Sequence, residues 1–559
     1  MTPIYKGQNT DPNQIFKGDS EIRQVFVGDD LVWEKPPGLL KVEVDTNVLP
    51  GTDVVIPLFE TSGLTVDWGD GTVSSGISHE YSDEGVYEIT ITGFAKRIGS
   101  PSTWAPNSQR KITKILDWDD LFGLEEIRFI NCLGLTSVPN FLPSGIKNLY
   151  HTFYGCSIFN DANVGLWDVS NITSMFGTFL NAGQFNQSLN GWNVSNVTDM
   201  AHMFQNAFAF NGDITGWDVS SVTNMSHMFN TGNTWGEFNQ NISGWNMSNV
   251  TNISYMFRRQ DKFNQPIGSW DVSSVTNMEG VFYWAMGFNQ PLSNWNTLNV
   301  INMSNMFFGA YAFNQTLDNN FVVSNVTNME MMFYRAGDFN KPLNHWNTSN
   351  VTNIYQMFYG ATSFNQDLDQ WDTSSVTNME GVFYNHYANT SNFNGKVSGW
   401  NTSNVTNMRR MFRNCRYFNQ PLTSFNTANV TNMGDMFSGA NVFNQPLSHF
   451  NTSKVNTMFS MFNLAKAFNQ NISGWDTSSV TTMSGMFNGA SAFNQPIGSW
   501  DTGSVTNMGL MFNAAIAFNQ DLSGWCVEHI EEEPANFMIG ANEDWVNNPS
   551  WHPQWGQPC

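Results

Sequence analysis

An acidic or amide residue follows the tryptophan in most copies of a repeated segment, and it is the first candidate for chemistry in this sequence. Two neighbouring carboxylates can hydrolyse a glycosidic bond when one donates a proton and the other acts as nucleophile or base. The carboxylates at this position are Asp168, Asp218, Asp271, Asp372, Asp476 and Asp501. Other copies carry Asn193, Asn246, Asn296, Asn347 and Asn401 instead. Because asparagine does not ionise, the position favours a turn-forming residue, and we expect no enzyme activity.

The residue directly after the Phe of a Met-Phe pair varies in a more informative way. In the middle of the chain this position holds five aromatic residues in succession, with an arginine before and after them. Later copies carry asparagine or serine there, so packing alone does not require an aromatic ring. An exposed row of this kind can stack on sugar rings or anchor a protein partner. The candidate ligand-binding residues are Arg258, Tyr283, Trp284, Phe308, Tyr334, Tyr359, Tyr384, Tyr387 and Arg413.

Other side chains near this row strengthen the pattern, and the alternatives to binding stay open. Two copies of the segment are longer than the rest, at residues 230–237, which include Trp235, and at residues 385–392. Insertions in repeat proteins map to one edge and often belong to the binding face. Further aromatic and basic residues nearby are Tyr311, Arg335, His386, Arg409, Arg410 and Arg416. The row also fits a subunit interface of a homo-oligomer, or a surface ladder without function.

A repeat of about 25 residues must position all of these side chains. A Phe-Asn pair begins each copy between residues 159 and 525, and ten of the fourteen intervals between pairs are 25 residues long. A period of this length is typical of a solenoid, because so short a unit buries its apolar side only against a copy of itself. The phenylalanines of these pairs are Phe159, Phe185, Phe210, Phe238, Phe263, Phe288, Phe313, Phe339, Phe364, Phe393, Phe418, Phe443, Phe468, Phe493 and Phe518.

Each copy predicts a coil of strand, turn, helical turn and turn. The Leu/Ile-x-x-Trp and Val-Thr-Asn-Met stretches are short enough for strands, which would pair in parallel between coils about 4.8 Å apart. The Met-Phe-x-x-Ala stretch suits one helical or 3₁₀ turn. The asparagine after each phenylalanine should form a ladder by bonding backbone groups at a turn. One position between two phenylalanines requires a small residue: Ala182, Ala207, Ala285, Ala490, Cys156 and Cys415.

These segments resemble the repeat of about 25 to 26 residues in BspA-like proteins and in Mycoplasma and Listeria surface lipoproteins. That family is similar to leucine-rich repeats, with Met, Phe and Trp in place of many leucines. The resemblance covers residues 159–525. It implies a leucine-rich-repeat-like solenoid, mainly of parallel β structure with short helical turns, that serves as a binding or adhesion scaffold. It implies no catalyst and names no ligand.

The composition narrows the range of partners and locations. The chain has 559 residues, of which only 13% are charged, and its net charge is −23. This balance argues against a nucleic-acid partner, because neutralising phosphates requires Lys and Arg. No apolar run is long enough to span a membrane, and the first residues do not form a secretory signal. We therefore expect no membrane insertion, no metal and no cofactor.

The five cysteines do not form a disulfide-built scaffold, because their number is odd and low. Cys526 and Cys559 bracket the final segment, so a disulfide between them would fasten it. Cys132 and Cys156 lie about one coil apart and could be stacked neighbours, and the sequence leaves open whether they are bonded.

Residues 1–37 predict a β-hairpin that docks on another protein. Apolar pairs flank Gly28-Asp29-Asp30, which is a hairpin signal. So small a unit does not hold a fold alone. The segment resembles short β-hairpin modules at the ends of bacteriophage tail and virion proteins, which implies an anchor to other virion proteins. Its candidate anchor residues are Tyr5, Phe16, Phe26 and Trp33. The alternative is a hairpin that only caps the next domain.

Three further segments complete the expected organisation. Residues 38–98 contain Trp68-Gly-Asp-Gly-Thr72 and Tyr81-x-x-x-Gly85-x-Tyr87, and they resemble a PKD domain, which is an Ig-like β-sandwich. Asp67 and Asp70 there fit a turn better than a cation site. Residues 99–158 predict atypical repeats that cap the solenoid, and residues 526–559 predict a C-terminal cap.

The expected function is a non-catalytic adhesion protein on a virion surface, similar to a bacteriophage tail or head fibre, which binds a host-surface glycan or protein. A bacterial cell-surface adhesin of the BspA-like kind is the first alternative. A polysaccharide-degrading enzyme and a purely structural decoration protein are the others.

Overall fold

The computed structural model describes residues 24–27, 30–34, 38–99, 110–118, 123–386 and 391–558, and only the backbone of the two strands before residue 38. The chain divides into two compact units, Met1–Asn171 and Ile172–Cys559. Each unit is described by itself.

The first unit begins with a two-stranded antiparallel pair. Strand β1 (Gln24–Val27) pairs with β2 (Asp30–Glu34), and the register shifts between Val25 and Phe26. The predicted anchor residues Tyr5 and Phe16 lie outside the described residues, as do the side chains of Phe26 and Trp33. Their docking role stays a prediction.

A larger, mostly antiparallel sheet follows in the same unit. Its strands lie in the order β6 (Val73–Ser74), β5 (Leu58–Asp67), β8 (Val86–Gly99), β3 (Leu39–Asp45) and β9 (Ile112–Asp117). A separate pair joins β4 (Asp53–Val55) to β7 (Ser78–Glu80). In β3 every second side chain is buried, namely Leu40, Val42 and Val44. This alternation places one face of the strand against the core.

The sheet continues beyond the domain boundary that the sequence indicated at residue 98. Strand β9 pairs with β3, and β10 (Glu126–Arg128) pairs in parallel with β8. Both strands come from the segment expected to hold only capping repeats. Because β8 is 14 residues long, its end offers unpaired backbone groups that β10 satisfies. The strands of residues 112–128 therefore belong to the same sheet as the domain before them.

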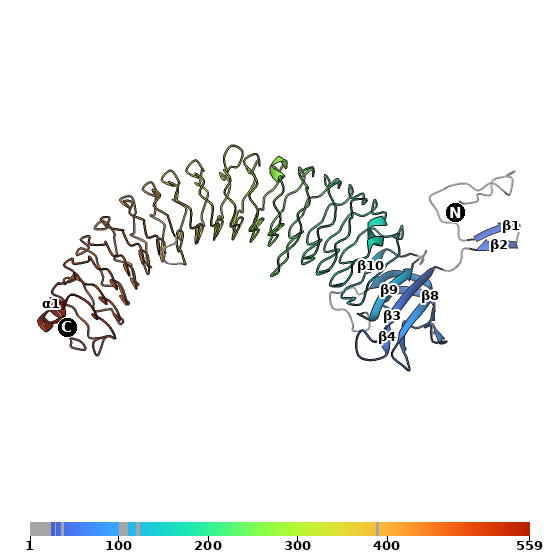
Figure 1. Ribbon diagram of the computed structural model, residues 1–559, viewed down its shortest axis with the longest axis horizontal. Coiled ribbons are helices and arrows are strands. Elements are labelled where there is room, and N and C mark those ends of the chain that lie inside the picture. Colours follow the sequence, from blue (N-terminus) through green and yellow to red (C-terminus); the bar gives the residue numbers. More distant parts are fainter. Residues whose placement is uncertain are drawn as a thin grey trace. The chain divides into compact units, whose positions relative to one another are not determined.

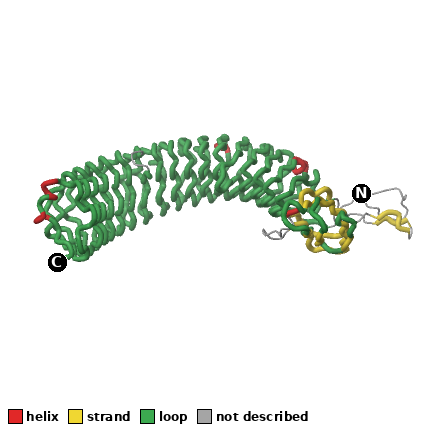
Figure 2. Tube along the Cα trace, turned by 60° about the horizontal axis from the view of Figure 1, so that its bottom comes forward, coloured by secondary structure: helices red, strands yellow, loops and turns green. Residues whose placement is uncertain are grey.

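The second unit is a stack of similar coils that contain almost no helix. Figure 1 shows its coils as narrow loops following one another, and Figure 2 colours nearly all of them as loop or turn. Isolated parallel bridges join equivalent residues of successive coils, for example Asn224 to Asn252 and Asn252 to Asn277. The predicted in-register stacking of the repeats is therefore confirmed.

The predicted helical turn at Met-Phe-x-x-Ala is wrong. In the coil that contains Met200, the amides of Met200 and His202 donate to the next coil, at Asn224 and Ser226, over 3.0 and 2.9 Å. The amide of Met203 instead closes a turn on Met200. Within the stretch, the amide of Ala207 bonds back to the carbonyl of Phe204 at 3.0 Å, and Asn206 has a φ of 57°, which a right-handed α- or 3₁₀-helical turn excludes. Alternate amides thus bond between coils, so the i to i−4 bonds of a helix do not form.

The predicted strands are present only as single bridged pairs. At Leu/Ile-x-x-Trp the chain turns instead, because the amide of Trp217 bonds back to the carbonyl of Ile214. The indole Nε1 of Trp217 donates to the carbonyl of Leu189 in the preceding coil at 2.9 Å. A side-chain donor therefore makes the contact between coils that a strand would make with its backbone. Within the array, the described helical elements are only the 3₁₀ turn Ile267–Ser269 (η3) and, at its end, α1 (Glu543–Val546) and η4 (Pro549–Trp551). The first unit contributes η2 (Ala162–Leu166).

Buried aromatic rings form columns through the core of the array. The centroids of Phe185 and Phe210 are 5.9 Å apart, and those of Phe210 and Phe238 are 6.0 Å apart, with nearly parallel planes. Rings at these separations attract each other beyond the area that they bury. The tryptophans form a second column, in which Trp245 and Trp270 lie 6.5 Å apart. These columns explain the high Phe and Trp content.

The predicted asparagine ladder is confirmed along the edge of the coils. The side-chain oxygen of Asn186 accepts a hydrogen bond from the amide of Asn211 at 2.7 Å. The same bond recurs in each following coil, and the amide of Asn519 donates to Asn494 at 2.8 Å at the far end. In many coils a glutamine adds a second donor, as Gln265 does to Asn239 at 2.8 Å. Each asparagine therefore satisfies a backbone amide that would otherwise lack a protein acceptor.

The position predicted to need a small residue is fully buried. Its members include Ala182, Ala285, Ala490, Cys156 and Cys415. The Cys415 thiol donates to the carbonyl of Phe383 at 3.1 Å, and burial raises its pKa to about 12. Cys132 and Cys156 are not disulfide-bonded, their side chains contact each other, and burial raises the pKa of Cys156. Cys526 is disulfide-bonded, but Cys559 lies outside the described residues, so that pair stays a prediction.

Replacing Asn289 tests the ladder. Asn289→Ala removes the acceptor for the amide of Asn314 at 2.9 Å and for the side chain of Gln315 at 2.9 Å. We expect the local free energy of opening to fall by about 1–2 kcal/mol, and the Asn314 amide to exchange its hydrogen about 5–30 times faster. Thr316→Ala is the control, because this exposed side chain makes no hydrogen bond to a described residue. Equal exchange rates in both variants would disprove the ladder's contribution.

Candidate functional site

The recurring carboxylates after tryptophan act as turn formers. Asp218 accepts a hydrogen bond from the amide of Ser220 at 3.0 Å, and Asn193 does the same for Ser195 at 3.2 Å. Hydrogen bonds from the serine two residues on lower the pKa of the carboxylates of Asp168, Asp218, Asp271, Asp372 and Asp476. A general acid at neutral pH needs a raised pKa instead. These carboxylates therefore do not suit glycosidase chemistry.

The predicted aromatic row forms a continuous stack. Ring centroids are 4.4 Å apart between Tyr283 and Phe308, 4.2 Å between Phe308 and Tyr334, and 4.3 Å between Tyr334 and Tyr359. Tyr384 meets Tyr359 edge to face at 4.7 Å. The register of the coils brings these rings together, because each lies at the same position of its repeat. The row is therefore one object, named here the aromatic stack (Tyr283, Phe308, Tyr334, Tyr359 and Tyr384).

The ring faces of the aromatic stack are not free to bind sugars, contrary to the expectation from sequence. Tyr359 is 7% exposed and Tyr384 is 8% exposed. Because each ring face covers the face of its neighbour, a ligand reaches mainly edges and hydroxyl groups. Sequence alone shows which position is aromatic but not whether the rings meet each other. Whether the ring faces are covered depends on the stacking of successive coils.

The stack extends further along the array than the sequence predicts. His202 and His227 lie 4.7 Å apart with nearly parallel rings, and Tyr255 continues the series at 5.1 Å from His227. Phe176 precedes them, and Tyr255 meets Tyr283 at 6.0 Å. His202, His227 and Tyr255 lie three residues earlier in the repeat than the row, and Phe176 lies four earlier, so the pattern at the row position does not include them. The recurrence of His202 and His227 after 25 residues was the available signal.

Every arginine of the second unit lies over an aromatic ring. The guanidinium carbons are between 4.5 and 5.8 Å from ring centroids, which is the range of cation–π attraction. Arg258 lies over Tyr283 at one end of the stack, and Arg413 lies over Tyr384 at the other. The seven arginines are Arg258, Arg259, Arg335, Arg409, Arg410, Arg413 and Arg416.

A group of more exposed rings lies beside the stack. Trp235 and Tyr311 are each 43% exposed, and Trp284 lies between them at 6.5 and 6.1 Å. Arg259 lies over Trp235 at 5.0 Å, and Arg335 lies over Tyr334 at 5.6 Å. We name this set the aromatic–arginine patch (Trp235, Arg259, Trp284, Tyr311 and Arg335). Its rings are open to a ligand, and so is Tyr417 farther along the edge, which is 46% exposed beneath Arg416.

Glycines in the next coil make room for the rings of this patch. A Cβ atom at Gly309 would lie 2.4 Å from the indole ring of Trp284, and one at Gly337 would lie 3.0 Å from Tyr311. Gly309 also has a φ of 67°, which favours glycine. The rings therefore lie flat against the following coil.

The first long loop brings Trp235 into this patch. Gln260 occupies the otherwise small buried position, and its side chain bonds the carbonyl of Phe229 and the amide of Phe238. Arg259 donates to the carbonyl of Asn233 at 3.2 Å. These bonds hold both ends of the loop. In the second long loop Tyr387 lies outside the described residues, whereas His386 is exposed and lies 3.4 Å from the hydroxyl of Tyr384.

The arginines at the far end of the stack are partly neutralised. Asp435 lies 2.8 Å from Arg413 and 3.4 Å from Arg410, and Glu380 lies 3.7 Å from Arg409. Burial raises the pKa of Asp435, while the neighbouring arginines oppose that shift. These ion pairs hold the coils together around residue 413.

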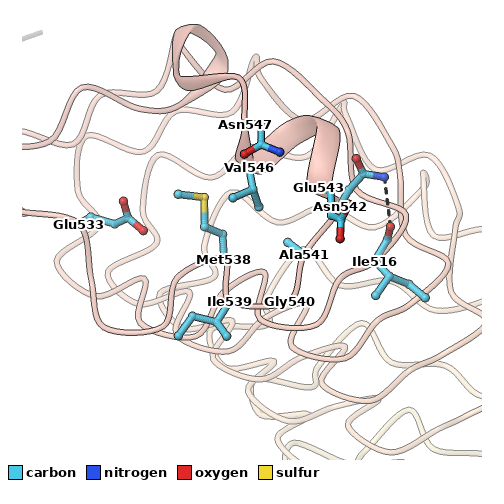
Figure 3. A pocket seen from close by; sticks show the side chains of 10 residues that line it. All are labelled: Ile516, Glu533, Met538, Ile539, Gly540, Ala541, Asn542, Glu543, Val546 and Asn547. Atoms are coloured by element: carbon cyan, nitrogen blue, oxygen red, sulfur yellow. Dashed lines mark hydrogen bonds between the residues drawn. The ribbon is translucent and has the colours of Figure 1, made fainter.

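Two further candidate sites are the turn at Asp67 and Asp70 and a hollow at the C-terminal cap, and neither presents a set of groups suited to bind a ligand. Asp67 and Asp70 bond the amides of Gly69 and Thr72, as expected for a turn, and the bonds from Thr72 and His79 lower the pKa of Asp70 to about 2. At the C-terminal cap a hollow of about 830 Å³ is lined by ten residues, including Ile516, Met538 and Ile539 (Figure 3). Asn542 donates to the carbonyl of Ile516 at its wall at 3.2 Å. The hollow has few polar groups that converge on a ligand.

Within the described ranges, no group of three or more His, Cys, Asp or Glu residues is arranged to hold a metal ion. The same part of the chain contains no helix that is long and apolar enough to cross a membrane.

Lowering the pH should destabilise the stack at His227. Burial, His202 and Arg258 lower the pKa of His227 from 6.5 to about 4, and its Nδ1 accepts a hydrogen bond from Asn230 at 2.8 Å. Because the folded pKa lies below the unfolded value, the stabilisation is complete above pH 6.5 and is lost as the pH falls towards 4. The melting temperature of His227→Gln should therefore fall less than that of the wild type between pH 7 and pH 4.5.

His529→Gln is the matched control, because His529 is an exposed histidine of the cap. It should keep the pH dependence of the wild type. An identical pH dependence in His227→Gln and wild type would contradict the assignment.

Comparisons with known proteins agree with the repeat architecture. The sequence pattern of a family described as "Mycoplasma protein of unknown function, DUF285" matches residues 129–235, 231–323, 319–388, 385–473 and 447–548. No curated protein matches the chain. The crystal structure of a TLR13–ssRNA13 complex is similar over 77% of this chain at 11% identity, with a TM-score of 0.16, and the match spans 61% of that structure's chain. So low a score supports no argument. On the tandem matches to its repeats, the chain belongs to the DUF285 family.

Proposed function

We propose that this chain is a non-catalytic adhesion protein whose repeat array binds a glycan or a protein on the surface of a host cell. The array acts as a rigid scaffold that carries a row of binding groups along one edge. Its coils are similar to leucine-rich repeats in their register, although they are built from turns.

The exposed rings of the aromatic–arginine patch are the observation that carries this proposal. Trp235 and Tyr311 each keep 43% of their surface exposed, although the fold buries most large aromatic residues. Large, rigid aromatic side chains provide contact area at low entropic cost and are enriched where proteins bind. Arg259 adds a charged donor over the ring of Trp235, and Arg335 adds another over Tyr334 in the neighbouring aromatic stack.

The proposal also assigns the protein to a virion surface, similar to a bacteriophage tail or head fibre. Residues 1–37 would attach it to other virion proteins, because the β1–β2 pair is too small to fold alone. The sheet that begins at residue 38 would be a PKD-like spacer between this anchor and the array. A homo-oligomer is compatible with this arrangement.

A bacterial cell-surface adhesin is the second candidate. The family match of the array to Mycoplasma proteins supports it. In both candidates the array has the same binding role, and they differ in what residues 1–37 attach to.

Removing the exposed rings tests the binding role. The double variant Trp235→Ala with Tyr311→Ala should bind host cells at least about tenfold more weakly than the wild type, because hot-spot aromatic residues each contribute about 2 kcal/mol or more. Binding of the labelled full-length chain to cells, measured by flow cytometry, gives the affinity. Melting temperatures of both proteins establish that the array remains folded.

Phe208→Ala with Ile516→Ala is the matched control. Both side chains are exposed and follow the buried alanine, as Tyr311 does, but they lie on coils outside the patch. Equal loss of binding in both double variants would remove the patch from the proposal.

Deleting residues 1–37 tests the anchor. Virions assembled with a chain that starts at residue 38 should lack the protein, whereas its melting temperature and its binding to host cells should be unchanged. Immunoblots of purified particles measure incorporation. Normal incorporation of the shortened chain would favour the cell-surface alternative or another attachment site.

A further inference from the structure

The distribution of arginine is the feature of the array that an adhesion role alone does not explain. The chain has a net charge of −23. Nevertheless, all seven arginines after residue 171 lie along the edge that carries the aromatic stack and the aromatic–arginine patch. Three of the five lysines of the same unit lie elsewhere in the repeat, namely Lys341, Lys396 and Lys454. The edge is therefore an arginine stripe on an acidic protein, although Glu279 and Glu380 also lie on it, at Tyr255 and Arg409.

The arginines of this stripe differ in whether they form ion pairs within the described part of the chain. Arg258, Arg259 and Arg335 make no ion pair with a described residue, whereas Arg409, Arg410 and Arg413 pair with Glu380 or Asp435. Cation–π contact orients a guanidinium group without cancelling its charge. These three arginines are therefore oriented, partly exposed cations, and Arg259 lies over the exposed ring of Trp235.

We infer that this edge binds an acidic polysaccharide whose sugar rings carry carboxylates, with the aromatic–arginine patch as its principal contact. The inference rests on the proposed adhesion function and names its ligand class. Trp235 and Tyr311 would pack against sugar rings, and Arg259 and Arg335 would pair with carboxylates through the planar fork that suits this group.

The geometry favours a sugar that bears its carboxylate on the ring, such as a uronic acid, over sugars linked by phosphate. A uronic acid bears its carboxylate directly on the sugar ring, so neighbouring protein groups must meet the ring and the acid. The guanidinium of Arg259 lies 5.0 Å from the ring centroid of Trp235, which supplies both groups at one place. A phosphate that links two sugars would be farther from either ring.

The spacing of the cations argues against nucleic acid. The groups at residues 258–259, 335 and 409–416 are three coils apart, which is roughly 14 Å at about 4.8 Å per coil. A nucleic-acid strand carries one phosphate per about 3.4 Å, so most of its charge would remain unpaired on this acidic protein. A polymer with sparser carboxylates matches the stripe better.

Binding of the full-length chain to immobilised polymers tests the inference. Polygalacturonate should bind at least about tenfold more tightly than neutral dextran, and added salt should weaken the binding. Arg259→Asn with Arg335→Asn should lose about tenfold or more of the affinity for polygalacturonate. Asparagine is suited to these positions, because Asn206 and Asn414 occupy the same slot with φ values of 57° and 61°, as Arg259 does at 60°.

Lys341→Asn with Lys454→Asn removes the same total charge at other positions of the repeat, and it should keep the wild-type affinity within about twofold. Equal losses in the two double variants would show that net charge alone explains the effect, and they would overturn the inference.

Tighter binding to a glycerol-phosphate teichoic acid, to poly-uridylate or to polyglutamate than to polygalacturonate would overturn the ligand class. Equal binding to dextran, lost in Trp235→Ala with Tyr311→Ala, would keep the adhesion function and reject the acidic ligand. Failure of the wild type to bind any polymer or host cell would reject the adhesion function itself.

Discussion

The register between successive coils is the constraint on which the rest of the array depends. Alternate backbone amides donate to the next coil, and side chains such as Asn186 and Trp217 satisfy groups that remain. Because a buried polar group without a partner costs free energy, a coil that slips out of register would lose all of these bonds together. Equivalent residues are therefore held in columns, whatever their chemistry.

Columns turn isolated residues into continuous surfaces. Phenylalanine and tryptophan at inward positions become stacked cores, as the 5.9 Å separation of Phe185 and Phe210 illustrates. The same stacking occurs at the edge, where the ring faces of Tyr334 and Tyr359 pack against each other with centroids 4.3 Å apart. A ring at such a position contributes to the stability of the array, and its faces are not available to a ligand. Rings become available to a ligand where a loop or a glycine changes the surface, as at Trp235 and Tyr311.

Charge on this protein is placed as selectively as the aromatic residues. The backbone bonds of a coil do not depend on which side chain follows the Met-Phe pair, so this position is free to vary. Arginine enters the array only beside rings that orient its guanidinium group, and at the patch end these cations lack ionic partners in the described structure. An acidic scaffold whose arginines all lie on one aromatic edge is consistent with selective adhesion to an anionic surface.

Periodicity alone determined much of this protein. The 25-residue step, the inward positions, the asparagine ladder and the small slot at Cys415 all follow from which residues recur. The sequence also located the aromatic row, but not its stack with His202 and His227, nor the burial of its ring faces. Backbone geometry was decided by tertiary structure, because bonds between coils compete with the helical turn that Met-Phe-x-x-Ala favours locally. Contacts between neighbouring coils likewise decided which rings stay exposed, since a column forms only when the whole array is in register.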